Sequence, residues 1–226
     1  MRDAFHEQLD SVFDDLADIS NRVRIAVHGA TTALLSGDAE IAERVISQDA
    51  AIDLARERVE DNAFSLLSLQ QPVAGDLRVL VAALRMVSEL ERMGDLSVHV
   101  AKIARLRVPN VAVPEDVRPT VSRMADVAES MVGRLARIIV DRDVEDAIAF
   151  AEADEEMDRL RRSTFAELLD GDWPHGVEAA VDIALLGRYY ERIADHAVSV
   201  ANRIVYIVTG ETPHSHESVA EVAVDL

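Results

Sequence analysis

The distribution of helix-breaking residues most constrains how this chain can fold. The chain has only 9 glycines and 6 prolines, and they gather in a few short stretches. The long intervals between them are rich in Ala, Leu, Val, Glu, Asp and Arg, a composition typical of long helices. Aromatic residues make up only 4% of the chain, and no set of alternating apolar and polar runs bounded by two-residue turns is present. The sequence therefore predicts an all-α protein.

Breaks in the helical pattern divide the chain into six long helices. They fall at Ser36-Gly37-Asp38, Gln71-Pro72, residues 108–114, Asp141-Arg142-Asp143 and Gly171-Asp172-Trp173-Pro174. Gly can close a helix in the left-handed conformation, Asp can cap the next helix, and Pro interrupts one. The helices are expected at residues 3–36, 38–70, 76–107, 115–141, 143–170 and 176–209. Because a helix of about 30 residues is ~45 Å long, we expect elongated antiparallel bundles.

The two halves of the chain are related in sequence. Residues 91–101 align without a gap with residues 191–201, and Glu, Arg, Asp, Val, Val and Ala are identical. A second match places Asp49 over Asp154 and Asp53 over Asp158. Chance rarely produces such matches, so the chain is interpreted as a tandem repeat of a three-helix unit. The predicted domains are a first bundle at 1–108, a second at 114–210 and a flexible acidic tail at 211–226.

Pairs of carboxylates recur at matched positions of the two repeats. Residues four apart lie on one face of a helix, so the members of each pair project side by side. The pairs are Asp49 and Asp53, Glu91 and Asp95, Asp154 and Asp158, and Glu191 and Asp195. By helical position, the Glu91 pair falls on the same side as Leu77, Leu80 and Val98 rather than on the solvated edge. Two like charges beside apolar residues need a compensating cation, either Arg, Lys or a metal.

The chemistry of these pairs favours hard metal ions. Carboxylate oxygens suit Mg, Ca, Mn or iron, and the chain has no cysteine to supply a thiolate ligand. A single acid pair has little meaning in a chain with 42 Asp and Glu residues, so the prediction depends on the repetition. Arg92 and Arg192 either pair with neighbouring carboxylates or have a functional role. We interpret His28 and His99 as structural, and His196 points about 100° away from Asp195.

At these residues the sequence resembles the PhoU family of bacterial phosphate-homeostasis regulators. The likeness covers nearly the whole chain and rests on four features. These are Glu-Arg-Met-Gly-Asp at 91–95, Glu-Arg-Ile-Ala-Asp at 191–195, Asp-Leu-Arg at 76–78 after Gln71-Pro72, and the tandem three-helix layout. The resemblance implies a six-helix protein of two similar bundles that dimerises and holds metal ions or multinuclear metal clusters on the bundle surfaces.

The family's residues can be carried over position by position. The resemblance implies metal ligands at Asp49, Asp53, Glu91, Asp95, Asp154, Asp158, Glu191 and Asp195. The ion would be a divalent or iron cation, such as Mg, Mn, Fe, Zn or Ca. In the second repeat Ala194 replaces Gly94, which could alter a close helix contact. Trp173-Pro174-His175-Gly176 replaces the Asp-Leu-Arg turn, so any role of that turn applies to the first bundle alone.

The resemblance also implies a signalling role and partners. A PhoU protein conveys the state of a phosphate-specific ABC transporter, through its ATPase, to a sensor histidine kinase. Phosphate-starvation genes then stay off while phosphate is plentiful. The expected molecule is a cytoplasmic, non-enzymatic adaptor that forms a homodimer and acts as a negative regulator of phosphate uptake.

Charge and hydropathy exclude several other classes of function. The formal net charge is −19, which repels nucleic acids and anionic membranes. No signal peptide or apolar run of ~20 residues is found, so no membrane insertion is expected. The sequence contains no nucleophile elbow, no Ser/His/Asp arrangement and no Arg or Lys cluster at a Gly-rich helix start that would hold phosphate.

Two alternatives to a metal-binding adaptor stay open. One is a di-iron carboxylate oxidase or metal-storage bundle of the ferritin-like type, which requires paired Glu-x-x-His ligands. The one Glu-x-x-His here runs from Glu211 to His214, in the predicted tail. The other is a structural helical adaptor whose acid pairs are fortuitous.

Overall fold

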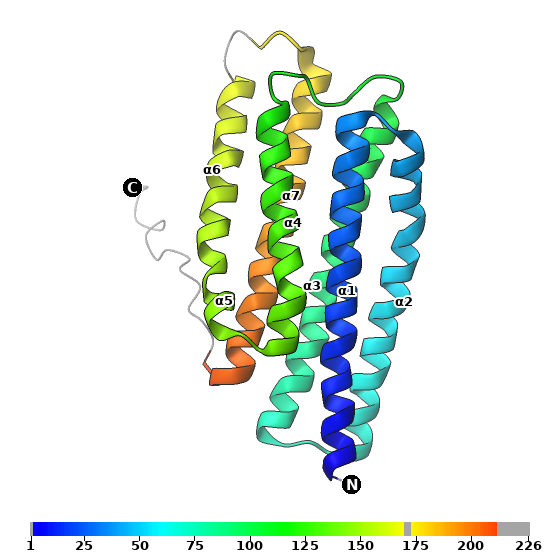
Figure 1. The fold of residues 1–226 in the computed structure, drawn as a ribbon, viewed down its shortest axis with the longest axis vertical. Helices are drawn as coiled ribbons and strands as arrows, with labels where there is room; N and C mark the ends of the chain where they lie inside the picture. Colours follow the sequence, from blue (N-terminus) through cyan, green and yellow to red (C-terminus); the bar gives the residue numbers. More distant parts are fainter. Residues whose placement is uncertain (1, 170–172, 212–226) are drawn as a thin grey trace, which may run out of the picture.

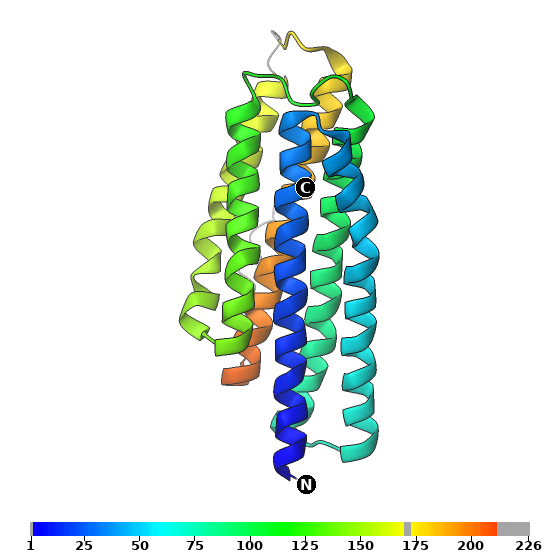
Figure 2. The same cartoon turned by 45° about the vertical axis from the view of Figure 1, so that its right-hand side comes forward.

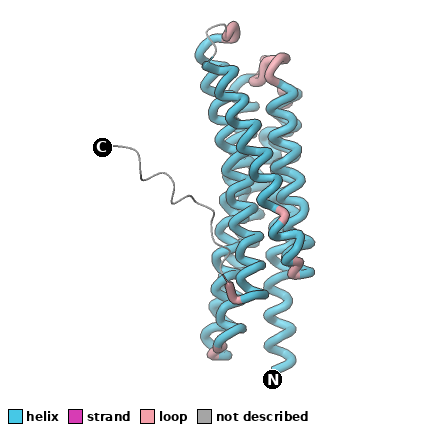
Figure 3. The backbone as a smooth tube through the Cα atoms, turned by 90° about the vertical axis from the view of Figure 1, so that its left-hand side faces the viewer, coloured by secondary structure: helices cyan, strands magenta, loops and turns pink. Residues whose placement is uncertain are grey.

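The computed structural model describes residues 2–169 and 173–211, and within these residues it contains helices and no strand (Figure 3). The predicted all-α class is confirmed. The helices are α1 (Arg2–Ser36), α2 (Ala39–Gln70), α3 (Ala74–Arg107), α4 (Arg118–Asp141), α5 (Val144–Ile148), α6 (Phe150–Leu169) and α7 (Gly176–Thr209).

Local sequence signals set several helix ends as expected. Gly37 adopts a φ of 67°, which only glycine adopts readily, and so closes α1. Asp38 then caps α2, because its carboxylate accepts hydrogen bonds from the amides of Glu40 and Ile41 at 2.9 and 3.0 Å. Gly210 ends α7 with a φ of 81°.

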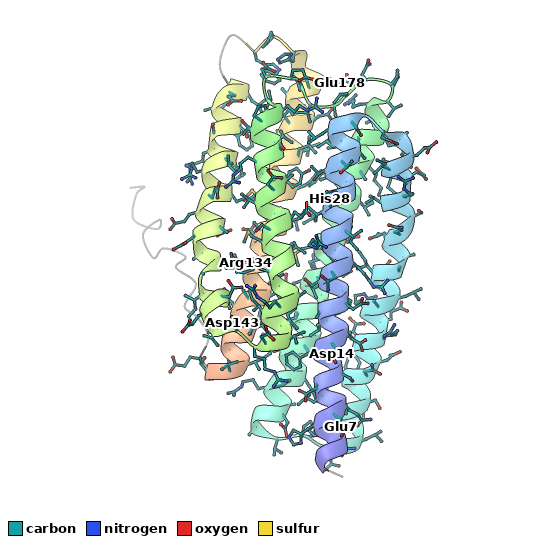
Figure 4. All side chains as sticks on the ribbon, in the orientation of Figure 1. Glu7, Asp14, His28, Arg134, Asp143 and Glu178 are labelled. Carbon is teal, nitrogen blue, oxygen red and sulfur yellow. The ribbon has the colours of Figure 1, made fainter. Side chains whose placement is uncertain are left out.

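The fifth predicted helix, at 143–170, is interrupted at Ala149 and forms α5 and α6. In an unbroken helix the carbonyl of Asp146 would accept the amide of Phe150. Here Arg134 of α4 donates to that carbonyl at 3.3 Å and to the Asp146 carboxylate at 3.1 Å. Figure 4 labels Arg134 on α4 and Asp143, which caps α5. A contact from another helix therefore competes with the helical hydrogen bond at the break.

The start of α4 also differs from the prediction. It begins at Arg118 rather than at 115. The carbonyl of Pro114 accepts the amides of both Val117 and Arg118, at 3.2 and 3.0 Å. These bonds form a turn that leads into α4. Residues 115–117, which the pattern assigned to the helix, belong to this turn instead.

The helices run side by side along the long axis in two groups (Figure 1). Helices α1, α2 and α3 contact one another, and α4, α6 and α7 do the same. The groups meet through α1 against α4 and α3 against α7. Helices α2 and α6 lie on opposite sides of the molecule, with α1 and α4 in the middle and α3 and α7 behind them (Figure 1). The arrangement confirms two tandem three-helix bundles.

The two bundles share one hydrophobic core. A single cluster of buried apolar side chains draws on all seven helices, including Leu16, Met86, Met131 and Ile193. Inside it, the hydroxyl groups of Thr31 in α1 and Tyr190 in α7 lie 2.8 Å apart. The predicted division at 1–108 and 114–210 follows the two groups of helices, and whether each folds alone stays a prediction.

The remaining expectations for the chain concern membranes and the tail. In the part of the chain that the structure describes, no helix combines the length and the apolarity needed to cross a bilayer. Of the tail predicted at 211–226, Glu211 is described and residues 212–226 lie outside the described residues.

Candidate metal centres

The four predicted ligands of the first repeat lie along the seam between α2 and α3, the two helices that lie side by side in Figure 2. We call Asp49, Asp53, Glu91 and Asp95 the first cluster. Burial raises the pKa of Asp49, and the negative charges of Asp95 and Asp53 raise it further. The pKa of Glu91 is raised by burial and then by Asp95. The pairs from the two helices therefore share one electrostatic environment.

Gly94 allows the close approach of the two helices at this cluster. A Cβ atom at Gly94 would lie 3.6 Å from Oδ1 of Asp49 and 3.1 Å from Cδ1 of Ile52. The smaller of these distances is tighter than nine in ten real Cβ contacts. The second repeat has Ala194 at this position, so the two seams are not packed identically.

The equivalent ligands of the second repeat meet at the seam between α6 and α7. We call Asp154, Asp158, Glu191 and Asp195 the second cluster. Burial raises the pKa of Asp154 to about 6, with further contributions from Asp195, Asp158 and Glu191. The pKa values of Glu191 and Asp195 are also raised, in each case mainly by burial. The two repeats thus build matched carboxylate clusters at matched seams.

The clusters differ in how their negative charge is offset. In the described part of the chain, no member of the first cluster makes an ion pair, although Lys102 and His99 lower the pKa of Asp49. In the second cluster, Glu191 pairs with Arg188 and, at 3.3 Å, with Arg161. Asp158 also lies 3.6 Å from Arg162. Arginines therefore compensate part of the second cluster.

Burial of the carboxylates is uneven. Glu191 is only 7% exposed, whereas Asp49, Glu91, Asp154 and Asp158 are half-buried. Asp53, Asp95 and Asp195 are exposed. The expectation that Glu91 and Asp95 both lie on the apolar side of α3 is therefore wrong for Asp95. The seam turns that edge of the helix toward solvent, and Leu77 on the same edge is 41% exposed.

The donor set fits a hard cation, but the carboxylates are held apart. Within residues 2–169 and 173–211, no three or more His, Asp or Glu side chains are gathered tightly enough to hold a metal ion. Raised carboxyl pKa values nonetheless show that negative charge in these seams is poorly compensated. A divalent or iron cation would have to draw the carboxylates of two helices together.

The histidines have other contacts. His196 lies 2.6 Å from Glu89 of α3, and His28 lies 2.9 Å from Glu129 of α4. His99 stacks on Tyr189 with ring centroids 5.3 Å apart. The structural interpretation of His28 and the exclusion of His196 from the ligands agree with these contacts. Sequence reasoning missed the proximity of His99 to Asp49, which its place one turn after Asp95 could have indicated.

Sequence reasoning also missed the counter-charges of the second cluster. Arg188 stands three residues before Glu191, so the i,i+3 spacing on α7 could have indicated that pair. Arg161 reaches Glu191 from α6. The pairing of α6 with α7 was needed to find it.

Comparison with known proteins agrees with this architecture. The PhoU domain model matches residues 16–104 and 121–204, once in each bundle. The chain is 46% identical over 213 residues to the phosphate-specific transport system accessory protein PhoU homolog 2 of Mycobacterium tuberculosis, covering 94% of this chain and 100% of that protein. It is 45% identical over 213 residues to PhoU homolog 1 of Mycobacterium leprae, covering 94% of this chain and 96% of that protein.

A solved structure gives the same result for the fold. The crystal structure of PhoU from Pseudomonas aeruginosa superposes with a TM-score of 0.86 at 26% identity, covering 92% of this chain and 100% of that chain. The family model therefore matches both repeats, and the fold is shared over 92% of this chain. The chain belongs to the PhoU family.

Proposed function

We propose that this chain is a non-enzymatic accessory protein that regulates phosphate transport. Its mycobacterial relatives are named accessory proteins of the phosphate-specific transport system, and they match over almost their entire length. In the proposed role the protein links a phosphate ABC transporter ATPase to a sensor histidine kinase. It acts in the cytoplasm as a homodimer and keeps the phosphate-starvation response off when phosphate is plentiful.

We also propose that the two carboxylate clusters bind divalent or iron cations. The observation that carries this proposal is the duplication of the clusters at equivalent seams, with raised carboxyl pKa values in both. A bound cation would offset the repulsion between like charges. In the first cluster Asp49 and Asp53 would bind it from α2, while Glu91 and Asp95 would bind it from α3.

The first cluster should bind metal more tightly than the second. Its carboxylates make no ion pair with any described residue, whereas Glu191 already contacts Arg161 and Arg188. A cation entering the second cluster competes with these two guanidinium groups. Metal binding should therefore proceed in two steps of different affinity.

Metal titration of two double variants tests the site assignment. E91Q/D95N should remove the tighter step, and E191Q/D195N should remove the weaker one. The control E57Q/D61N changes exposed acids with the same spacing on α2 and should keep both steps. Circular dichroism would verify that all variants stay folded. Equal metal binding by wild-type protein and both cluster variants contradicts the assignment.

Binding to partners tests the adaptor role separately. The full chain should retain the transporter ATPase and the cytoplasmic region of the kinase in pull-down experiments. Loss of these interactions in the cluster variants would show that partner binding requires the bound metal. Absence of both interactions at micromolar concentration, with and without added metal, counts against an adaptor even if the metal sites are real.

A further inference from the structure

Among the described residues, the seam between α3 and α7 gathers arginines that make no ion pair within 4.0 Å. Most arginines in this acidic protein make ion pairs. Among the described side chains, the arginines without an ion pair within 4.0 Å are Arg44, Arg78, Arg85, Arg92, Arg159, Arg192 and Arg203. All of these except Arg44 and Arg159 lie on α3 or α7.

Contacts across the seam fix how the two antiparallel helices are aligned. Arg107 donates to Asp182 near one end, and Arg78 lies 5.7 Å from the ring centroid of Tyr206 near the other. Between them, Nδ1 of His196 lies 2.6 Å from Oε2 of Glu89. Glu89 and His196 therefore stand opposite each other.

Arginines flank this pair from both helices. Arg92 comes one turn after Glu89 on α3, and Arg192 comes one turn before His196 on α7. Because the helices are antiparallel, both lie on the same side of the pair, at nearly the same level. By the same spacing, Arg85 and Arg203 lie on the other side. We call Arg85, Arg92, Arg192 and Arg203 the seam arginines.

Two of the seam arginines, Arg92 and Arg203, act directly on the charge of Glu89. The hydrogen bond with His196 lowers the pKa of Glu89, and the positive charges of Arg92 and Arg203 lower it further. One carboxylate thus faces several cations. In addition, Nε of Arg203 and Nε2 of His196 are buried without a hydrogen-bond partner in the described part of the chain. The buried Nε–H of Arg203 is costly unless something accepts a hydrogen bond from it.

We propose that the seam arginines bind a multiply charged oxyanion of the phosphate and sulfate class, held between Arg92 and Arg192. Guanidinium groups present planar pairs of N–H donors that match the oxygens of such anions. Arg92 and Arg192 occupy equivalent positions in the two repeats, so the anion contacts both bundles at once. This site depends neither on the proposed metal clusters nor on the adaptor role.

Titration with inorganic phosphate tests the site. Calorimetry at constant ionic strength would use the full chain carrying E91Q/D95N/E191Q/D195N, so that phosphate bound to a metal ion in the clusters cannot contribute. In this background R92Q/R192Q should weaken phosphate binding at least tenfold. The matched control R44Q/R159Q removes two equally unpaired arginines elsewhere and should leave the affinity within twofold. Sulfate should compete, and acetate should not.

Each alternative result overturns the proposal. Absence of phosphate binding up to about 10 mM, where even a millimolar site is filled, rules out the site. Equal weakening in R44Q/R159Q shows general charge attraction only. Phosphate binding that disappears in the four-carboxylate background, while persisting in metal-loaded wild-type protein, places the anion on the metal ions. Far-UV circular dichroism and melting temperature of each variant confirm that the comparison is between folded proteins.

Discussion

Asp154 has a carboxyl group whose charged form the folded structure disfavours. Its carboxyl is half-buried between α6 and α7 and feels the negative charge of four other acids, and its pKa is raised to about 6. The folded state therefore holds a proton on Asp154 at pH values where the unfolded chain has released it. Because the folded pKa is raised above the ordinary value of 3.8, Asp154 makes the free energy of unfolding fall as pH rises from about 4 through 6.

We predict that D154N stabilises the metal-free protein at pH 7. The amide replaces a charge that the fold disfavours, and solvent screening at this half-buried position limits the gain to about 1 kcal/mol. At pH 4 the folded protein carries a neutral Asp154 and the unfolded chain is only partly ionised there, so the difference should be much smaller. Urea unfolding at the two pH values, in the presence of chelator, measures it. D61N, at an exposed position on α2, is the control and should have little effect; a gain for D154N that is independent of pH would contradict the electrostatic cause.

Spacing along the helix predicted which carboxylates stand side by side, but not how each is compensated. Glu91 with Asp95 and Glu191 with Asp195 follow from the i,i+4 geometry. Glu191 is 7% exposed and paired with Arg161, whereas Asp95 is exposed. This difference depends on how α6 packs against α7 and how α2 packs against α3. The pairing of Glu89 with His196 joins the two repeats and leaves no local signal at all.

At the scale of helices, some glycines mark positions where two helices pack closely together. Gly29 lies in α1, and a Cβ atom there would come within 2.9 Å of Cγ2 of Val45 in α2. Val45 is buried and β-branched, so its side chain has few rotamers with which to move away. Gly187 in α7 is different, because a Cβ atom there would meet Cε of Met124 at 3.9 Å, an ordinary contact.

We predict opposite effects for the same substitution at these two glycines. G187A should stabilise the protein by up to about 1 kcal/mol, because alanine favours a helix more than glycine does. G29A gains the same propensity but forces α1 and α2 apart, and overpacking costs about 1–3 kcal/mol. G29A should therefore be destabilising, by about 1 kcal/mol. Thermal and urea unfolding of the two variants measure these changes in stability. A stabilised G29A would mean that α1 and α2 can move apart at a lower cost than the contact with Val45 indicates.

Local signals predicted most helix ends and failed where a distant side chain intervenes. The signals that were predicted correctly, at Gly37, Asp38 and Gly210, act on the backbone within a few residues. Such local signals can be recognised in the sequence alone. At the break near Ala149, a side chain from another helix, Arg134, donates to the carbonyl of Asp146. Alanine is the best helix former, so no pattern at the break itself could have indicated it.

For the whole molecule, the repeat predicted two similar bundles but not how they join. Apolar periodicity shows that a helix has a buried face, without showing which helix covers it. In the structure α1 and α3 are each covered on one side by a helix of the other bundle. Because the core is shared, we expect the two halves to unfold as one cooperative unit, although the family model matches each bundle separately.

Tyr190 offers a test of that cooperativity. It is 1% exposed, belongs to the second bundle, and its hydroxyl pairs with that of Thr31 in the first. Y190F should leave Thr31 without this partner and cost about 1–2 kcal/mol. Y189F changes the neighbouring ring, which stacks on His99 without using its hydroxyl, and should cost less than about 0.5 kcal/mol.

The decisive measurement compares two probes of unfolding in Y190F. Trp173 is the chain's single tryptophan and lies just before α7, so its fluorescence reports on the second bundle. Far-UV circular dichroism reports on all the helices. If the shared core couples the bundles, both transitions move together to lower denaturant concentration. Separation of the two curves, with the fluorescence change preceding the loss of helix, would show instead that the hydroxyl pair links two units that unfold independently.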